Sequence, residues 1–277
     1  MMNLGVDSIG VSNVKLAVVD VETTGLDPVA QELIGLCVVS VEVDRVTGEG
    51  LKIVNRYAGW REPNRQISPD LEQVLRISAA ELSGEDLDIA QIDAVLDGCE
   101  LVIAHNAAFD RAFLAPYVPV LERLTWVCSL RDIDWFGTEE QPKASIDHLL
   151  ALYGLKVSGG MPVDDCDALI QILGMPLPVS GHTGFAALLA SARAPRYRYW
   201  VPAPGADSVP ALMELGFVFC PQENAWSAIA GGVYAQKLES TLVDMAVFDG
   251  RFHQFSVEEV KMPPTPSSCQ SRLPAST

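Results

Sequence analysis

The stretch LAVVDVETTGLDP, residues 16–28, joins an apolar run to two carboxylates and a turn. Residues 16–19 are apolar and partly β-branched, which predicts a buried strand. Asp20 and Glu22 follow two positions apart, so both carboxylates of a strand project from one face. Two such acids repel each other unless a cation lies between them, and hard oxygen ligands suit magnesium or manganese. The alternative is a strand end whose acids face water.

After the acids, the sequence predicts a turn and then a long hairpin. Residues 23–25 turn the chain, and Gly25 is available for a backbone conformation that other residues avoid. Residues 32–44 form a long apolar strand in this prediction. The turn TGEG follows, and residues 51–60 return as the partner strand.

Strands and helices alternate in the next part of the chain. Short apolar runs predict strands, and apolar residues at helical spacing predict helices. The strands are expected at residues 101–104 and 125–129, the helices at 89–99, 107–113, 145–155 and 163–173, and a short helical or turn region at 71–82. A hairpin followed by this alternation indicates an α/β fold with a mixed sheet flanked by helices.

Composition excludes several classes of protein. The chain has 277 residues, a hydrophobic fraction of 49% and no apolar run long enough to span a membrane. Its first residues lack a basic start and an apolar signal core, and its six cysteines include no CxxC pair, so a cytoplasmic protein with reduced thiols is expected. The net charge of −17 argues against a broad basic surface for duplex nucleic acid.

A second motif, LVIAHNAAFDRAFL, spans residues 101–114. Asn106 is a plausible N-cap after the strand, and Asp110 falls in the first turns of the helix. Phe109 and Phe113 are four residues apart and share a face of that helix. Asp110 could bind a metal while an aromatic ring packs against a base. Taken alone, the motif favours the alternative, in which the acid faces solvent and the rings belong to the core.

A third motif is the helical segment VDDCDALIQIL, residues 163–173. Asp164 and Asp167 lie on one polar stripe, whereas Asp165 falls on the apolar side of the helix. An acid among core residues demands a partner, because an unpaired buried charge is costly. We therefore expect Asp165 to be a metal ligand and Asp167 to be its exposed neighbour.

Together, DVETTG, HNAAFD and the late helical acid resemble the proofreading-type 3′-to-5′ exonucleases of the ribonuclease-H-like superfamily, which are named for four acidic residues. Within them, the chain resembles bacterial proteins similar to the epsilon subunit of DNA polymerase III. The resemblance covers roughly residues 14–175. It implies a ribonuclease-H-like fold and a metal-dependent exonuclease acting on single-stranded DNA or RNA, with DNA favoured.

The resemblance also implies roles for individual residues. Two Mg²⁺ or Mn²⁺ ions would be held by Asp20, Glu22, Asp110 and Asp165, with Asp20 bridging both. Residues expected to bind the substrate are Thr23, Thr24, Gly25, Leu26, His105, Asn106 and Phe109. The expected partners are a 3′ end, a nucleoside monophosphate product and a polymerase or repair protein, without a membrane.

One departure from the family pattern concerns the general base. The histidine subtype places His five residues before the last acid, and the tyrosine subtype places Tyr four before it. Gly160 and Met161 occupy these positions here. Loss of a general base costs about 10²- to 10⁴-fold in rate. The sequence thus predicts a slowed exonuclease, or alternatively an inactive nuclease-like module that binds nucleic acid or regulates.

The composition changes after residue 174. We expect an exonuclease domain at 1–178, a linker helix at 179–194, a small α+β module at 195–260 and a disordered tail at 261–277. Within the module, the sequence predicts a strand, a helix and a hairpin. That helix contains no Lys or Arg, which does not favour a role in nucleic-acid binding.

Overall fold

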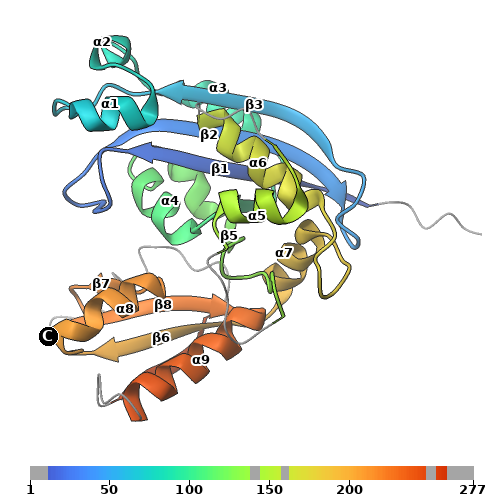
Figure 1. The fold of residues 1–277 in the computed structure, drawn as a ribbon, viewed down its shortest axis with the longest axis vertical. Helices are drawn as coiled ribbons and strands as arrows, with labels where there is room; N and C mark the ends of the chain where they lie inside the picture. Colours follow the sequence, from blue (N-terminus) through green and yellow to red (C-terminus); the bar gives the residue numbers. More distant parts are fainter. Residues whose placement is uncertain (1–11, 138–143, 157–161, 248–253, 261–277) are drawn as a thin grey trace, which may run out of the picture.

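The computed structural model describes residues 12–137, 144–156, 162–247 and 254–260, and it contains a larger and a smaller sheet (Figure 1). The larger sheet has the strand order β3-β2-β1-β4-β5. Its central strand, β1, pairs antiparallel with β2 and parallel with β4, so the predicted mixed sheet is confirmed. The strands are β1 Asn13–Thr23, β2 Leu33–Asp44, β3 Lys52–Trp60, β4 Leu101–Ala104 and β5 Thr125–Cys128.

Both faces of β1 are buried, which explains why its apolar residues run continuously. Leu16 and Val18 pack on one face, and Ala17 and Val19 pack on the other, each with an exposed fraction of 0%. The alternation continues beyond Val19. It therefore projects the acids at positions 20 and 22 from the face that carries Leu16 and Val18.

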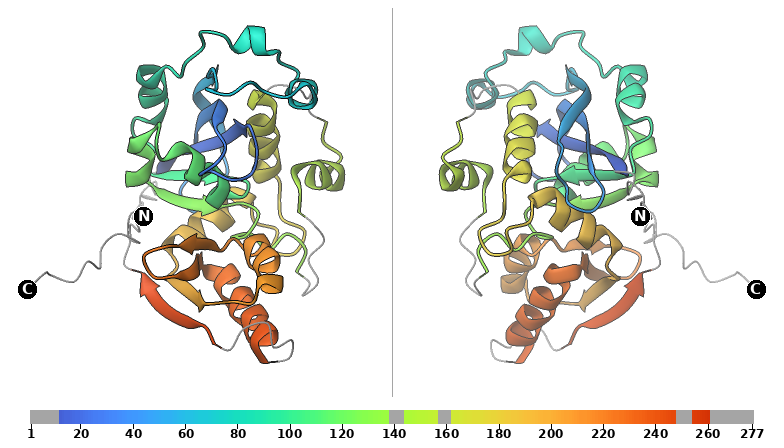
Figure 2. Two further views of the ribbon diagram at one scale, coloured as in Figure 1. Left: turned by 90° about the vertical axis from the view of Figure 1, so that its left-hand side faces the viewer. Right: turned by 90° about the vertical axis from the view of Figure 1, so that its right-hand side faces the viewer.

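Helices cover both faces of the larger sheet, as the side views show (Figure 2). Helices α3 and α4 pack on one face, and α5, α6 and α7 on the other. The helix expected at 89–99 is shorter, because Asp97 is its C-cap and Gly98 adopts a left-handed conformation with φ 74°. The helices are α1 Pro69–Leu75, α2 Ala79–Leu82, α3 Ile89–Leu96, α4 Ala107–Leu114, η1 Pro119–Arg123, α5 Ile146–Tyr153, α6 Pro162–Gly174 and α7 Gly184–Arg193.

The smaller sheet is antiparallel, with the order β7-β8-β6-β9. The expected strand, helix and hairpin are present, but two further elements, α9 and β9, were not predicted. Helix α9 covers the sheet with apolar residues three or four positions apart, a pattern that could have revealed it. The elements are β6 Arg196–Pro202, η2 Ala206–Ser208, α8 Val209–Glu214, β7 Val218–Cys220, β8 Ala225–Gly231, α9 Gly232–Val247 and β9 Ser256–Val260.

Helix α7, expected as a linker, packs into the core beneath the larger sheet. Phe185, Leu188 and Leu189 are almost fully buried there. At Gly184 the helix approaches α6 so closely that a Cβ atom would lie 2.9 Å from the Cα atom of Leu173. The two helices therefore share one core.

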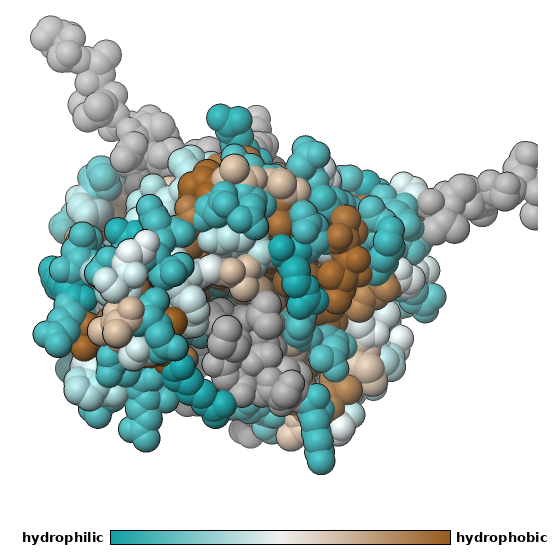
Figure 3. Space-filling view, turned by 90° about the horizontal axis from the view of Figure 1, so that it is seen from above, coloured by the Kyte–Doolittle hydropathy of each residue, from teal (hydrophilic) through white to brown (hydrophobic). Residues whose placement is uncertain are grey.

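The surface is mixed in hydropathy, and the described cysteines are buried. One face of the molecule is mainly hydrophilic with separate hydrophobic patches (Figure 3). In the described part of the chain, no helix combines the length and apolar character needed to cross a membrane. The described cysteines are buried free thiols: Cys37, Cys99, Cys128, Cys166 and Cys220.

Candidate active site

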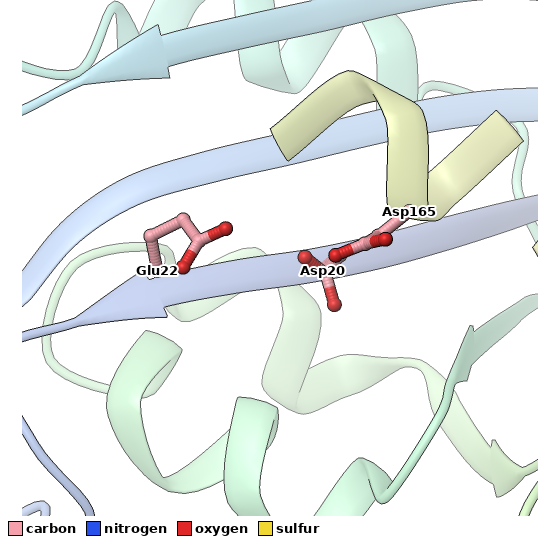
Figure 4. A group of neighbouring side chains, drawn as sticks. All are labelled: Asp20, Glu22 and Asp165. Atoms are coloured by element: carbon pink, nitrogen blue, oxygen red, sulfur yellow. The ribbon is translucent and has the colours of Figure 1, made fainter. Parts of the chain in front are cut away.

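Three carboxylates converge where β1 leaves the core. Asp20 and Glu22 project from β1, and Asp165 approaches from α6 (Figure 4). Each offers an oxygen, and these oxygens all lie within 4.8 Å of one another. Pairing of Asp20 with Cys37 of β2 fixes the strand at this point, and the register shifts just beyond Glu22. The arrangement concentrates negative charge at the edge of an apolar core.

Asp110 adds a fourth carboxylate from α4. Its exposed fraction is 3%, and the backbone N–H of Val21 donates a hydrogen bond to it. Burial is the main cause that raises the pKa of Asp110 to about 8, and the charge of Glu22 raises it further. Asp110 lies outside the group of three described carboxylates that meet within 4.8 Å, but its charge also acts on Asp20.

Asp20 and Glu22 also hold their protons more tightly than usual. Burial, followed by the charges of Asp110, Asp165 and Glu22, raises the pKa of Asp20 well above its ordinary value. Burial and the charge of Asp165 raise the pKa of Glu22 to about 7. A cation would relieve this repulsion, and a set made only of carboxylate oxygens fits a hard divalent ion. The residues present therefore fit magnesium or manganese.

We expect Glu22→Gln to stabilise the metal-free protein increasingly as the pH rises from about 5 to about 7. A carboxyl whose pKa is raised on folding binds more protons in the folded state. Its penalty is therefore absent below the unfolded pKa and grows as the pH approaches the folded pKa. Urea unfolding in a chelator at several pH values measures the difference from the wild type.

Asp167→Asn is the matched control for this titration. Asp167 is paired with Arg56 at 3.3 Å and lies outside the cluster, so its replacement removes an ion pair and relieves no repulsion within the cluster. A gain from Glu22→Gln that is equal at every pH would contradict the raised pKa.

The environments of the two helical acids are the reverse of those expected. Asp165 is exposed, whereas Asp167 is half-buried and paired with Arg56. Cys166, with an exposed fraction of 0%, enters the core between them. At this point α6 lies beside the end of β1, so Asp165 reaches Asp20 and Glu22 although it falls on the apolar side of the helix. The selection of Asp165 over Asp167 nevertheless matches the cluster.

The turn after β1 is held by a network of short hydrogen bonds. The Thr24 N–H donates to the Glu32 carbonyl at 2.9 Å, and the Glu32 N–H donates to Thr24 Oγ1 at 2.8 Å. The expectation for Gly25 was wrong, because its φ is not positive. Space decides this position instead, since a Cβ atom there would lie 2.9 Å from Gln31 Cγ. Leu26 has an exposed fraction of 83%.

Other expected substrate residues follow the adjacent strand, β4. Burial lowers the pKa of His105 to about 4, so its ring is neutral, and Nδ1 lies 2.9 Å from Ser129 Oγ. Asn106 occupies the N-cap position with φ 83°, but its side chain does not cap the helix, contrary to expectation. Phe109 is half-buried, with its ring centroid 4.9 Å from that of Phe113.

Two contacts of the site were not foreseen from the sequence. Ser129, fully buried after β5, orients His105, and the backbone of Val21 binds Asp110. A polar residue at the end of a predicted strand was a signal for the first. The second depends on a backbone group and left no signal in the side-chain pattern. Thr23, half-buried at the end of β1, donates a hydrogen bond to the Gly25 carbonyl at 2.7 Å.

Comparison with known proteins places this geometry in a family. The RNase_T family model, described as "Exonuclease", matches residues 17–173. The chain belongs to this family. The RNase_T match extends from β1 to α6 and therefore contains all four carboxylates. The exonuclease resemblance inferred from the sequence motifs is confirmed at this level.

Relatives of this RNase_T chain include polymerases and separate nucleases. It is 31% identical over 126 residues to a PolC-type DNA polymerase III of Thermotoga petrophila, which covers 45% of this chain and 9% of the polymerase. It is 34% identical over 119 residues to exodeoxyribonuclease 10 of Escherichia coli K12, which covers 42% of this chain and 46% of that protein. The chain thus spans less than half the length of these curated relatives.

A solved structure is also similar to the RNase_T chain. It is described as exonuclease X in complex with 5′ overhanging duplex DNA, with 28% sequence identity and a TM-score of 0.41. The similarity covers 64% of this chain and 98% of that protein.

Proposed function

We propose that this protein is a metal-dependent exonuclease that removes nucleotides from the 3′ end of single-stranded nucleic acid, with DNA favoured. The observation that carries the proposal is the convergence of Asp20, Glu22 and Asp165 within 4.8 Å in an RNase_T domain. Asp110 adds its charge from α4. The similarity to an exodeoxyribonuclease supports DNA over RNA.

The four carboxylates would hold two Mg²⁺ or Mn²⁺ ions. When bound, such ions stabilise the attacking and leaving oxygens of an in-line displacement at phosphorus. The fit rests on the hard oxygen donors and on the raised pKa values of Asp20, Glu22 and Asp110, which come first from burial and then from the repulsion between the acids.

The chain's own residues bind and orient the strand end in this proposal. Leu26 and Phe109 would pack against the terminal base, while Thr23, Thr24 and Gly25 hold the turn beside its sugar. His105 and Asn106 would border the cleft. Because the pKa of His105 is about 4, it is a poor proton acceptor near neutral pH. The histidine of the histidine subtype is replaced by Gly160, which lies outside the described residues.

The missing base supports a second candidate, an inactive nuclease-like module that binds nucleic acid or regulates a polymerase or repair partner. The observation in its favour is the pair Gly160 and Met161 at the positions of the subtype His and Tyr. Against it stands the carboxylate cluster, because uncompensated acids are costly to retain without a cation.

Digestion of labelled oligonucleotides separates the two candidates. A single strand labelled at its 5′ end should yield a ladder in manganese, and a 3′-labelled strand should release mononucleotide at once. DNA and RNA versions report the sugar preference. A protein that binds these strands without shortening them would be the regulatory module, and cleavage that persists in Asp20→Asn would point to a contaminating nuclease.

We expect Leu26→Ala to raise KM roughly tenfold without changing the melting temperature. The side chain is 83% exposed, so the fold does not depend on it, whereas burial against a base would be worth a kcal/mol or more. Steady-state hydrolysis and thermal unfolding measure the two quantities. Val29→Ala is the control, because Val29 is 94% exposed in the same loop and should leave KM unchanged. Equal effects of both variants would exclude Leu26 from substrate binding.

A further inference from the structure

A cavity of about 270 Å³ lies between the exonuclease domain and the small module. Its walls come from α4 and β5 on one side, and from β6, β8 and α9 on the other. Strand β5 belongs to the larger sheet and β6 and β8 to the smaller one, and α4 lies above the smaller sheet in Figure 1. The cavity thus exists only because the module packs against the domain.

Four arginines line this cavity, in a chain that has 19 Lys and Arg residues and a net charge of −17. Such a local excess of positive charge contrasts with the rest of the protein and favours an anion. The arginines come from α4, from the segment after β5 and from β6. They are Arg111, Arg131, Arg196 and Arg198.

Nearby acids do not neutralise all of this charge. Glu122 lies 3.3 Å from Arg111, and Glu258 lies 3.7 Å from Arg198. Asp132, in the cavity wall, is the third acid. Among the described residues that line the cavity, Asp132 is the only acid beside the four arginines.

Two buried side-chain nitrogens of Arg196 lack a hydrogen-bond partner among the described residues. Its exposed fraction is 8%, and its Nε and Nη2 find no hydrogen-bond acceptor in the described part of the chain. Nη2 lies 3.5 Å from Asp132 Oδ2, but that oxygen already accepts the Cys128 N–H at 2.8 Å. A buried donor without a partner is costly, so a ligand acceptor here would stabilise the folded protein.

Apolar and aromatic side chains complete the cavity. Trp126 and Tyr234 line it, and both use their polar atoms elsewhere, on the carbonyls of Leu121 and Leu215. A volume of about 270 Å³ falls near the lower end of small-molecule sites, which begin at roughly 300 Å³. The occupant is therefore compact, with an anionic end and a flat apolar end.

We propose that this cavity binds a nucleoside monophosphate, with its phosphate on Arg196 and its base beside Trp126 and Tyr234. A phosphate monoester carries a charge of about −1.5 to −2 near neutral pH, which suits the arginines. On α4, Ala108, Arg111 and Ala112 line the cavity, whereas Asp110 projects from another side of the helix. The cavity is thus distinct from the carboxylate cluster, and the proposal does not rest on nuclease activity.

Calorimetry on the full chain tests the site. The titration uses thymidine monophosphate in a chelator with an Asp20→Asn background, so that the carboxylate cluster contributes no metal-dependent binding. Thymidine and inorganic phosphate, each lacking one half of the ligand, should bind at least tenfold more weakly. An absence of binding heat at millimolar thymidine monophosphate, or equal affinity for thymidine, would overturn the proposal.

Two variants locate the binding. Arg196→Gln should lower the affinity for thymidine monophosphate by about tenfold or more. Arg65→Gln, which removes an exposed loop arginine, should leave that affinity unchanged. Ala112→Met fills the cavity without altering its charges, so it keeps the test valid if Arg196→Gln fails to fold. Its control is Ala90→Met on the exposed side of α3. Unchanged affinity in Ala112→Met would place the ligand elsewhere and overturn the proposal.

Discussion

Asp20→Asn should abolish both hydrolysis and the rise in melting temperature that divalent ions cause, while raising the melting temperature of the metal-free protein. Loss of hydrolysis is expected because Asp20 lies at the centre of the cluster, where the charges of Asp110, Asp165 and Glu22 all raise its pKa. A ligand that binds only the folded state stabilises it, so loss of the ion removes the shift. Loss of metal-assisted charge stabilisation, worth several kcal/mol, predicts a fall in rate of about 10³-fold or more.

The expected stabilisation of the metal-free Asp20→Asn variant is the more discriminating part of this prediction. Replacing one carboxylate of a crowded, partly buried cluster by a neutral amide removes repulsion, whereas most substitutions destabilise. Thermal unfolding in a chelator and in millimolar magnesium or manganese measures both shifts. Asp167→Asn, on the same helix as Asp165, should retain the metal response. If calorimetry finds no divalent binding to the wild type, the metal assignment fails.

Gly160→His should raise the rate of single-strand hydrolysis by about 10²-fold or more. The substitution restores an imidazole five residues before Asp165, the spacing of the histidine subtype. In the proposed mechanism the four acids would hold the metal ions, and the new imidazole would accept the proton of the attacking water. Single-turnover hydrolysis of a labelled oligonucleotide measures the gain, and its pH profile should acquire a titration near the ordinary pKa of histidine, about 6.5.

Two double variants distinguish catalysis by the new histidine from an indirect effect. Gly160→His combined with Asp20→Asn should be inactive, because the imidazole has no role without the carboxylate cluster. Gly160→His combined with Pro162→Ala tests whether proline restrains the preceding residue and misdirects the segment. Unchanged rates in both the single variant and the Pro162→Ala combination, with metal binding retained, would favour the regulatory module.

The larger sheet and three acids of the cluster could be predicted from local patterns. The period of two along β1 places Asp20 and Glu22 on one face, and uninterrupted apolar residues indicate that both faces are covered. The helical period places Asp165 on the side of its helix that faces the sheet, although its exposure to solvent was not predicted. Periodicity specifies which side of an element a residue occupies, but exposure depends on where the neighbouring elements end.

The features that could not be predicted depend on contacts between distant segments. The motif of Asp110 taken alone favoured an acid facing solvent, and only the family resemblance implied a metal ligand. Its burial and its hydrogen bond from the Val21 N–H depend on how α4 approaches β1. The cavity between domain and module has no local signature, because Arg111 and Arg196 are 85 positions apart in the chain. Helix α9 is a different case, since its apolar spacing was present in the sequence.

The packing of α7 constrains how the two parts of this protein can recombine with other chains in evolution. A crossover at residue 178 would separate Phe185, Leu188 and Leu189 from the core that they fill, and would leave Gly184 facing a foreign partner for α6. A crossover at Ala194 and Pro195, between α7 and β6, keeps that core whole. A recombination boundary that replaces the small module should therefore lie after α7, so that α7 stays with the exonuclease domain.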